Sequence, residues 1–299
     1  MFLRKLSALP WLPLLPVTVI ILVSIFSPWI MPFDPAQQDY SALLQGPNAT
    51  HWLGTDYLGR DLFSRLLGGA RVSMVAMAIV LVSALVIGVV IGSFAGYVGG
   101  VVELVMISII DIILALPSLI FALALIGILG AGYWAMIFAL TMAWWANYAR
   151  MSRSVVATEL QLPYIEAARV MGASHLWIYT RHILPHVLGL VIVYASADAG
   201  ALVISIATLS FLGLGVQPPT PEWGQMLVDG MSYIEQSPHL VILPGLALTF
   251  VVVSFNLLGE AFALSKVPHP ISRFAFRNRR AVRTAEEVAR AKIETEARS

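Results

Sequence analysis

The sequence predicts an all-α, polytopic membrane protein with six transmembrane helices. Of its 299 residues, 59% are hydrophobic and only 12% are charged, and the mean hydropathy is +0.83. These values lie far outside the range of ordinary soluble domains. A helix needs about 20 mainly apolar residues to cross the hydrocarbon core of a bilayer. The segments that approach or exceed this length are approximately 11–32, 72–98, 101–130, 133–150, 186–215 and 240–264.

The first apolar segment follows a short head that contains Arg4 and Lys5, as the core of a secretory signal would. We interpret it as an uncleaved span. Its apolar run has the length of a span, prolines interrupt it, and no small-residue cleavage site follows Pro28-Trp29.

The distribution of lysine and arginine predicts that both termini are cytoplasmic. Cytoplasmic loops carry an excess of these residues near the ends of spans. With the N-terminus inside, 15 of the 18 lysines and arginines fall on the cytoplasmic side. The three exceptions are Arg60, Arg65 and Arg71, which lie in the first outside loop.

Three regions follow from this topology. Residues 1–71 hold a cytoplasmic head, the first transmembrane helix and an outside loop that ends in an amphipathic stretch. Residues 72–264 form a core of five transmembrane helices, with a long cytoplasmic loop over 151–185. Residues 265–299 form a charged cytoplasmic tail, rich in Ala, Glu and Arg, for which we predict a short solvated helix or disorder.

Several kinds of function are excluded or disfavoured by what the chain lacks. It has no cysteine, so it has no disulfide or thiolate metal site. No phosphate-binding Gly-x-x-x-x-Gly-Lys-Ser/Thr loop and no hydrolase motif is present. Of the six histidines, only His182 and His186 form an i, i+4 pair, and Pro185 between them favours ordinary interfacial residues over metal ligands. A net charge of +1 gives no basic surface for nucleic acid. We therefore expect a non-catalytic chain that binds no cofactor or metal of its own and no nucleic acid.

The most informative segment joins the fourth and fifth predicted spans. It reads Tyr-Ile-Glu-Ala-Ala-Arg-Val-Met-Gly-Ala-Ser over residues 164–174 and continues to Leu184-Pro185. The residues predict a helix, a sharp turn at Gly172, a second short helix and a proline at the mouth of the fifth span. The small alanines would let another protein surface approach closely.

This segment resembles the Glu-Ala-Ala loop of permease subunits of binding-protein-dependent ABC importers. One position departs from the motif, because His182 stands where the motif has isoleucine. The resemblance implies a type I ABC importer permease fold and a coupling loop that inserts into a groove of a separate ATPase. The alternative is an ordinary surface helix-turn-helix, since Glu-Ala-Ala often occurs by chance. The residues that match the motif are Glu166, Ala167, Ala168, Gly172, Leu184 and Pro185.

Residues 52–71, ahead of the second span, resemble the dipeptide, oligopeptide and nickel branch of these permeases, which supplies one subunit type of a heterodimer. In a helix, Leu58, Leu62, Phe63 and Leu66 would form one apolar face, and the other face would carry Arg60, Asp61 and Arg65. We predict an interfacial helix that lies along the membrane surface and orients the second span.

The run from Ser210 to Gly224 resembles the same branch, as do residues 111–118 and Pro244-Gly245. It would form a proline-stiffened outside hairpin next to the pore. We expect this hairpin to be a docking surface for a substrate-binding protein. The candidate docking residues are Pro218, Pro219, Glu222 and Trp223.

Within the predicted spans, glycines and acids carry the remaining signals. Gly88, Gly92 and Gly96 share one face of the second span, which predicts close helix packing within the subunit or against a partner. Ionisable groups in spans are costly and point to function. We assign Asp198 as the pore candidate, with a hydrogen-bonded structural role as its alternative, and expect Asp111 to form an ion pair or a cap.

On these grounds the chain is identified as a permease subunit that forms half of the pore of an ATP-driven importer in the bacterial cytoplasmic membrane. The resemblance implies a second homologous permease, two ATPase subunits that use ATP and Mg, and an extracytoplasmic substrate-binding protein. Dipeptides or oligopeptides are the expected substrates. Nickel chelates, glutathione and antimicrobial peptides are alternatives. A secondary transporter or a membrane enzyme is a weaker alternative, since each needs polar or catalytic sets that are not visible here.

Overall fold

The computed structural model describes residues 14–266, with side chains up to Ala263. The chain divides into two compact units, one up to Ala261 and one from Phe262. The head 1–13 and nearly all of the predicted tail 265–299 lie outside the described residues. Every regular element in the described part is helical. The elements are α2 (Leu14–Ile30), α3 (Leu62–Val98), α4 (Gly100–Leu114), α5 (Ser118–Leu129), α6 (Tyr133–Glu159), α7 (Pro163–Val170), α8 (His175–Ile178), η1 (Tyr179–Ile183), α9 (Leu184–Phe211), α10 (Trp223–Met231) and α11 (His239–Lys266).

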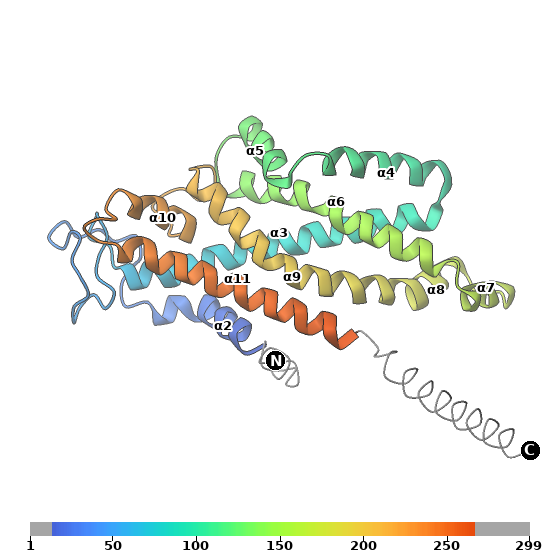
Figure 1. The fold of residues 1–299 in the computed structure, drawn as a ribbon, viewed down its shortest axis with the longest axis horizontal. Helices are drawn as coiled ribbons and strands as arrows, with labels where there is room; N and C mark the ends of the chain where they lie inside the picture. The colour runs from blue at the N-terminus through green and yellow to red at the C-terminus, as the bar shows by residue number, and fades with distance from the viewer. Residues whose placement is uncertain (1–13, 267–299) are drawn as a thin grey trace, which may run out of the picture. The chain divides into compact units, whose positions relative to one another are not determined.

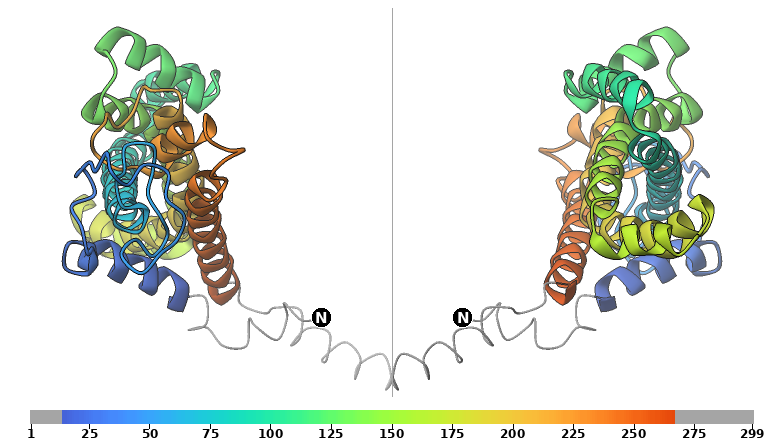
Figure 2. Two further views of the ribbon diagram at one scale, coloured as in Figure 1. Left: turned by 90° about the vertical axis from the view of Figure 1, so that its left-hand side faces the viewer. Right: turned by 90° about the vertical axis from the view of Figure 1, so that its right-hand side faces the viewer.

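The centre of the first unit is the packing of α3 against α6 and α9 (Figure 1). α4 and α5 pack on α6, whereas α2 packs on α3 at the opposite side of the unit (Figure 2). This places the long helices side by side with short connections, as the short links between the predicted spans indicated.

The three glycines of α3 make the α3–α6 contact close. A β-carbon at Gly92 would stand 2.1 Å from the carbonyl oxygen of Ala149, and one at Gly88 would stand 2.6 Å from that of Trp145. A β-carbon at Gly96 would meet the Arg153 carbonyl at 2.9 Å. The predicted packing role is confirmed, and the partner is α6 of the same chain.

The third predicted span, 101–130, is not one helix. It is broken between Leu114 and Ser118, and the two halves meet at an angle of 88°. Pro117 explains the break, because it lacks an N–H and disfavours helical geometry in the residue before it. Among the described residues, three helices are long and apolar enough to span a membrane, and the bent pair could make a fourth. The predicted count of six spans is therefore not confirmed.

The predicted interfacial helix before the second span is also wrong. The helix begins only at Leu62 and continues without interruption to Val98. Asp61 caps it by accepting a hydrogen bond from the Ser64 N–H at 2.8 Å. Arg60, Asp61 and Arg65, which were expected to face water or headgroups, are each only 2% exposed.

Candidate coupling and pore sites

The loop between α6 and α9 folds as an elbow, defined here as residues 163–183. Its first arm is α7, which begins with Pro163 in the first turn, where the missing N–H costs nothing. Ile165 and Ala168 face inward and are 0% and 5% exposed. Glu166 and Ala167 face outward. The arm is thus anchored on one side and leaves the first two residues of the Glu-Ala-Ala motif open to a partner.

Gly172 ends the first arm in a Schellman motif. Its N–H donates to the Arg169 carbonyl at 3.0 Å, and the N–H of Ala173 donates to the Ala168 carbonyl at 3.0 Å. Gly172 has a φ of 82°, which strains any residue with a β-carbon. No atom lies within 4 Å of the place where such a β-carbon would stand. The need for glycine therefore comes from the backbone and not from crowding.

The second arm of the elbow runs into α9 without a break. Ser174 caps α8 by accepting a hydrogen bond from the Trp177 N–H at 3.3 Å. The π-helical turn η1 then leads to Leu184 and Pro185 in the first turn of α9. Because Pro185 has no N–H and its ring crowds the carbonyl four residues earlier, a wider turn before it relieves the conflict. Residues 175–211 thus form one continuous helical rod.

Side chains outside the motif tie the elbow to α3, α6 and α9. The Tyr97 hydroxyl, near the end of α3, lies 2.9 Å from Nδ1 of His175. Glu159, at the end of α6, accepts a hydrogen bond from the Tyr164 hydroxyl at 2.5 Å and lies 3.2 Å from Nδ1 of His186. Two causes raise the pKa of Tyr164 to about 12: the larger is desolvation by burial, and the second is the hydrogen bond to Glu159. Sequence reasoning missed these anchors because each pair meets only in the folded chain.

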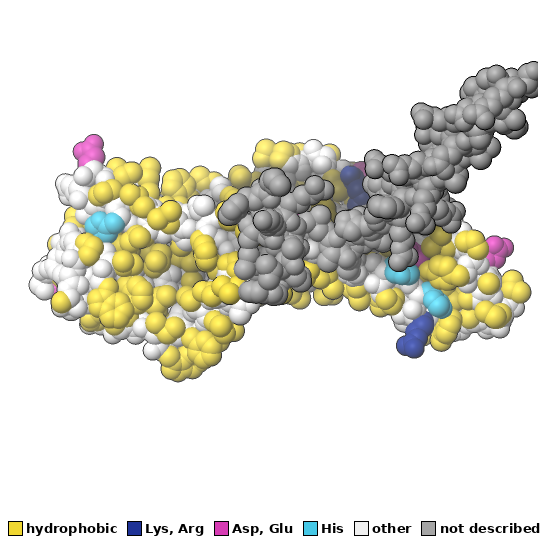
Figure 3. Space-filling model, turned by 60° about the horizontal axis from the view of Figure 1, so that its bottom comes forward, with side chains coloured by type: hydrophobic (Ala, Val, Ile, Leu, Met, Phe, Trp, Pro, Cys, Tyr) yellow, Lys and Arg dark blue, Asp and Glu magenta, His cyan; other side chains and the backbone are white. Residues whose placement is uncertain are grey.

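The elbow also presents large apolar side chains to its surroundings. Val170 is 85% exposed, Met171 80% and Leu176 72%. Figure 3 shows hydrophobic side chains at the end of the molecule that holds α7 and α8. An exposed apolar patch in a polar region marks an interaction site.

The pore candidate Asp198 lies on α9 and is half-buried. Its Oδ2 accepts a hydrogen bond from the Tyr148 hydroxyl of α6 at 3.1 Å. This contact joins the two helices on either side of the elbow and fits the structural alternative; a pore role for Asp198 stays a prediction. Asp111 pairs with Arg150 at 2.5 Å, so the expected ion pair is confirmed.

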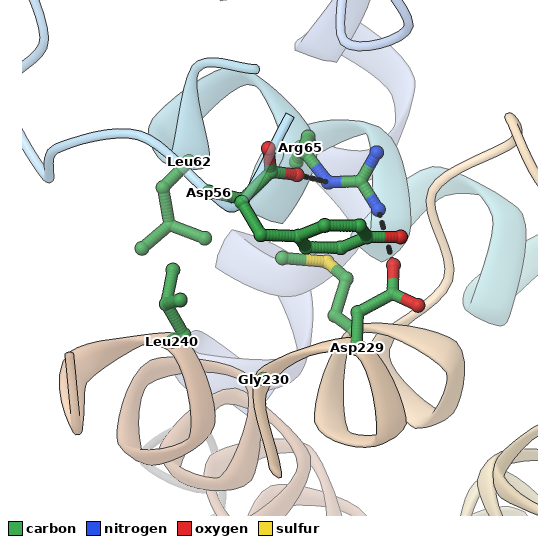
Figure 4. A pocket seen from close by; sticks show the side chains of 8 residues that line it. Asp56, Leu62, Arg65, Asp229, Gly230 and Leu240 are labelled. Atoms are coloured by element: carbon green, nitrogen blue, oxygen red, sulfur yellow. Dashed lines mark hydrogen bonds and ion pairs between the residues drawn. The ribbon is translucent and has the colours of Figure 1, made fainter. Parts of the chain in front are cut away.

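At the end of the molecule opposite the elbow, which is the predicted outer end, a largely buried ion cluster joins the loop before α3 to α10. We define it as Asp56, Arg60, Arg65 and Asp229. Arg65 bridges the two acids, with its Nε 3.3 Å from Asp56 and its Nη2 3.3 Å from Asp229 (Figure 4). Arg60 bridges the same two acids, with its Nε 2.6 Å from Asp56 and its Nη2 3.4 Å from Asp229. The two arginines and the two carboxylates neutralise each other, which explains how Asp56, Arg60 and Arg65 tolerate burial and how Asp229, whose side chain is 15% exposed, tolerates partial burial.

The predicted docking role of Glu222 and Trp223 is wrong, because both side chains are buried. Glu222 is 0% exposed and caps α10 by accepting a hydrogen bond from the Gln225 N–H at 3.1 Å. It also accepts a bond from the Ser73 hydroxyl at 2.9 Å. Burial raises the pKa of Glu222. Trp223 is 3% exposed, and its indole N–H donates to the Leu66 carbonyl at 3.0 Å.

Both side chains bond to α3 and therefore hold the hairpin onto that helix. Because they are buried, they are not available to a docked protein. Pro218 and Pro219 are exposed, and their docking role stays a prediction.

Comparisons with known proteins agree with this architecture. The family described as "Binding-protein-dependent transport system inner membrane component" matches residues 88–265, and the N-terminal TM domain of oligopeptide transport permease C matches residues 14–47. The nickel transport system permease protein NikC of Escherichia coli (strain K12) is 39% identical over 264 residues, which are 88% of this chain and 95% of NikC. The glutathione transport system permease protein GsiD of Pectobacterium atrosepticum is 40% identical over 245 residues, 82% of this chain and 81% of GsiD.

A solved structure shows the same fold. An inward-facing conformation of the MetNI methionine ABC transporter aligns with a TM-score of 0.55 at 22% identity, over 69% of this chain and 98% of that one. The fold is thus that of a type I ABC importer permease. The family match covers more than half of the chain and includes the whole elbow, α6 and α9. The chain belongs to the family of binding-protein-dependent transport system inner membrane components, the multi-pass permease subunits of ABC transporters.

Proposed function

We propose that this permease forms half of the translocation pore of an ATP-driven importer and that a separate ATPase subunit grips it at the elbow. The observation that carries the proposal is the combination of a stiff backbone with an exposed apolar surface. The Schellman turn at Gly172 sets the angle between the arms, and Val170, Met171 and Leu176 are exposed around it.

The mechanism follows from the connection of the elbow to its neighbours. Because residues 175–211 form one rod, a displacement of the elbow by a closing ATPase pair would tilt α9 directly. Glu159 would pass the same displacement to α6, and Tyr97 would pass it to α3. The Tyr148–Asp198 contact between α6 and α9 would then open or close as the pore alternates between its two sides.

The proposed partners are a second homologous permease, two ATPase subunits that hydrolyse ATP with Mg, and an extracytoplasmic substrate-binding protein that docks near Pro218 and Pro219. Both chain termini are proposed to be cytoplasmic. The permease itself supplies the path and performs no chemistry.

For the substrate, we propose a short peptide, a class that includes glutathione, the substrate in the name of GsiD. A nickel complex is the second candidate, because NikC matches over 95% of its own length. Calorimetry on the cognate binding protein with dipeptides, glutathione and nickel chelates would separate these candidates. Binding of none of them would refute both.

The elbow is tested by placing a charge on its apolar surface. In the transporter reconstituted with its ATPase, Val170→Glu should lower ATP-driven uptake and ATPase co-purification by about tenfold or more, as loss of an interface anchor does. Ile234→Glu is the matched control, because Ile234 is 44% exposed but lies between α10 and α11. Unchanged uptake by Val170→Glu would reject the proposed grip, and gradient-driven uptake without any ATPase would favour a secondary transporter.

A further inference from the structure

We infer that an apolar cavity between α2, α3 and α11 binds one acyl chain of an outer-leaflet phospholipid. The cavity has a volume of about 190 Å³. Its walls come from three helices and from the first residue of α10. The lining residues are Val19, Ile20, Val23, Leu66, Leu67, Ala70, Trp223, Ala247, Phe250 and Val251.

The chemistry of the walls selects a hydrocarbon occupant. Trp223 has the one polar group among these ten side chains, and its indole N–H is already bonded to the Leu66 carbonyl at 3.0 Å. The cavity is open on one side, and water would find no free polar partner on its walls. An empty cavity forfeits dispersion contacts along all its walls, so an apolar chain that can enter from the membrane is stabilised there.

The depth of the cavity matches the acyl region of the outer leaflet. Trp29, 76% exposed at the outer end of α2, has the position of an interfacial aromatic residue. Val19 and Val23 precede it by 10 and 6 residues, which in a helix is about 9–15 Å toward the membrane centre. On α11, Ala247 and Val251 follow His239 by 8 and 12 residues, or about 12–18 Å. Both helices therefore place the cavity between the outer interface and the middle of a hydrocarbon core about 30 Å thick, a depth that the acyl chains of the outer leaflet reach.

The size of the cavity favours a lipid chain over a helix of a partner protein. An α-helix with its side chains is about 10–12 Å wide, which a cavity of about 190 Å³ cannot admit. Figure 3 shows many hydrophobic side chains on this side of the molecule outside the grey residues, as expected for contact with lipid. A bound acyl chain would contact Trp223 and so support the start of α10, the helix that Glu222 caps.

The test uses the transporter assembled with its partner subunits in nanodiscs that contain a phosphatidylethanolamine with a diazirine in the middle of one acyl chain. After illumination, mass spectrometry should find lipid adducts enriched severalfold at Val23, Leu67 and Val251, which line the cavity, over exposed positions such as Leu22, which is 46% exposed. Ala247→Phe fills the cavity and should lower these adducts about tenfold, because overpacking excludes an occupant.

Leu246→Phe is the matched control, since Leu246 is the neighbouring residue on α11 but is 60% exposed and does not line the cavity. This control should keep the full level of adducts. Val23→Phe fills the cavity from α2 and replaces Ala247→Phe if that variant fails to assemble. Adducts spread evenly over exposed positions, adducts unchanged in both filled variants, or no adduct because a partner side chain fills the space would each overturn the inference.

Discussion

The two ends of this permease, called inner and outer here after the proposed orientation with both termini cytoplasmic, treat charged and apolar side chains in opposite ways. At the inner end, the elbow exposes Val170 and Met171, and its polar anchors, Glu159 with Tyr164, lie at the periphery. At the outer end, the ion cluster buries Arg60 and Arg65 at 2% exposure inside a single chain. The elbow thus exposes apolar side chains where charged ones would be expected. The opposite end buries charged side chains that a loop in water would normally expose.

The difference shows which end is complete by itself. The outer end satisfies its own charges and caps, so it can keep its shape without a partner. The elbow has a fixed backbone but an unsatisfied surface, which is the state expected of a docking element before its partner binds. Substitutions at the outer end should therefore act on stability, and those at the elbow should act on coupling.

The largest expected effect comes from opening the ion cluster. Arg65→Met leaves the carboxylate of Asp56 buried and that of Asp229 partly buried with one bridge fewer, which should destabilise the folded chain by about 3 kcal/mol. Thermal unfolding of the purified transporter measures the change. Arg71→Met is the matched control on the same helix, because Arg71 is exposed and has no ion pair among the described residues. Equal losses in the two variants would contradict a special role for the cluster.

The next effect separates coupling from stability. Gly172→Val forces a β-branched residue into a φ of 82°, a strain of about 1–2 kcal/mol or more that should break the Schellman turn. ATP-driven uptake should fall about tenfold or more, while membrane insertion, measured by fractionation, stays normal. Gly172→Asn is the control, because asparagine tolerates this conformation and should keep most uptake. Normal uptake by the valine variant would reject the lever.

A smaller effect is expected from one anchor of the elbow. Tyr164→Phe removes the hydroxyl that donates to Glu159. The loss of this hydrogen bond should weaken the attachment of the elbow to α6 by about 1 kcal/mol. We expect ATP hydrolysis to become partly uncoupled from uptake, measured as ATP used per substrate transported. Tyr40→Phe removes a hydroxyl bonded only two residues away, to Gln38, and should leave this ratio unchanged. If both variants behave alike, the anchor does not transmit the movement.

The smallest effect is a change in the pH dependence of stability at the outer end. Burial raises the pKa of Glu222 above its usual 4.5, so the folded protein holds this proton more tightly than the unfolded chain. The free energy of unfolding should therefore fall as pH rises from 4.5 through the raised folded value. Glu222→Gln cannot titrate, and its thermal unfolding should depend less on pH over this range. A steeper dependence in the variant would contradict the sign.

The sequence-based predictions were accurate where a feature depends on residues close together in the chain, and less accurate where it depends on residues far apart. The turn at Gly172 was predictable because a Schellman motif is decided within six residues. The packing role of Gly92 was predictable from spacing, but its partner, Ala149, was not. Pro117 carried a local signal for the broken third helix, although the apolar run around it predicted a continuous span.

The outer end was predicted least well. Arg60 and Arg65 have the spacing of a solvated helix face, but in the folded chain they pair with Asp56 nearby and with Asp229, more than 160 residues away in the chain. Glu222 and Trp223 were expected at a docking surface for the same reason: nothing near them in the sequence shows that the Ser73 hydroxyl will donate to Glu222 or that the Leu66 carbonyl will accept from Trp223.

By itself, the sequence determined the membrane class, the all-helical fold, the family and the position of the elbow, because these depend on composition, on apolar length and on short motifs whose geometry is local. Only the tertiary structure decided which charges are enclosed, which helix is broken and which side chains tie the elbow to α3, α6 and α9. Those outcomes depend on contacts between residues far apart in the chain. Their free energy comes from excluding water and pairing polar groups, which happens only when the helices pack.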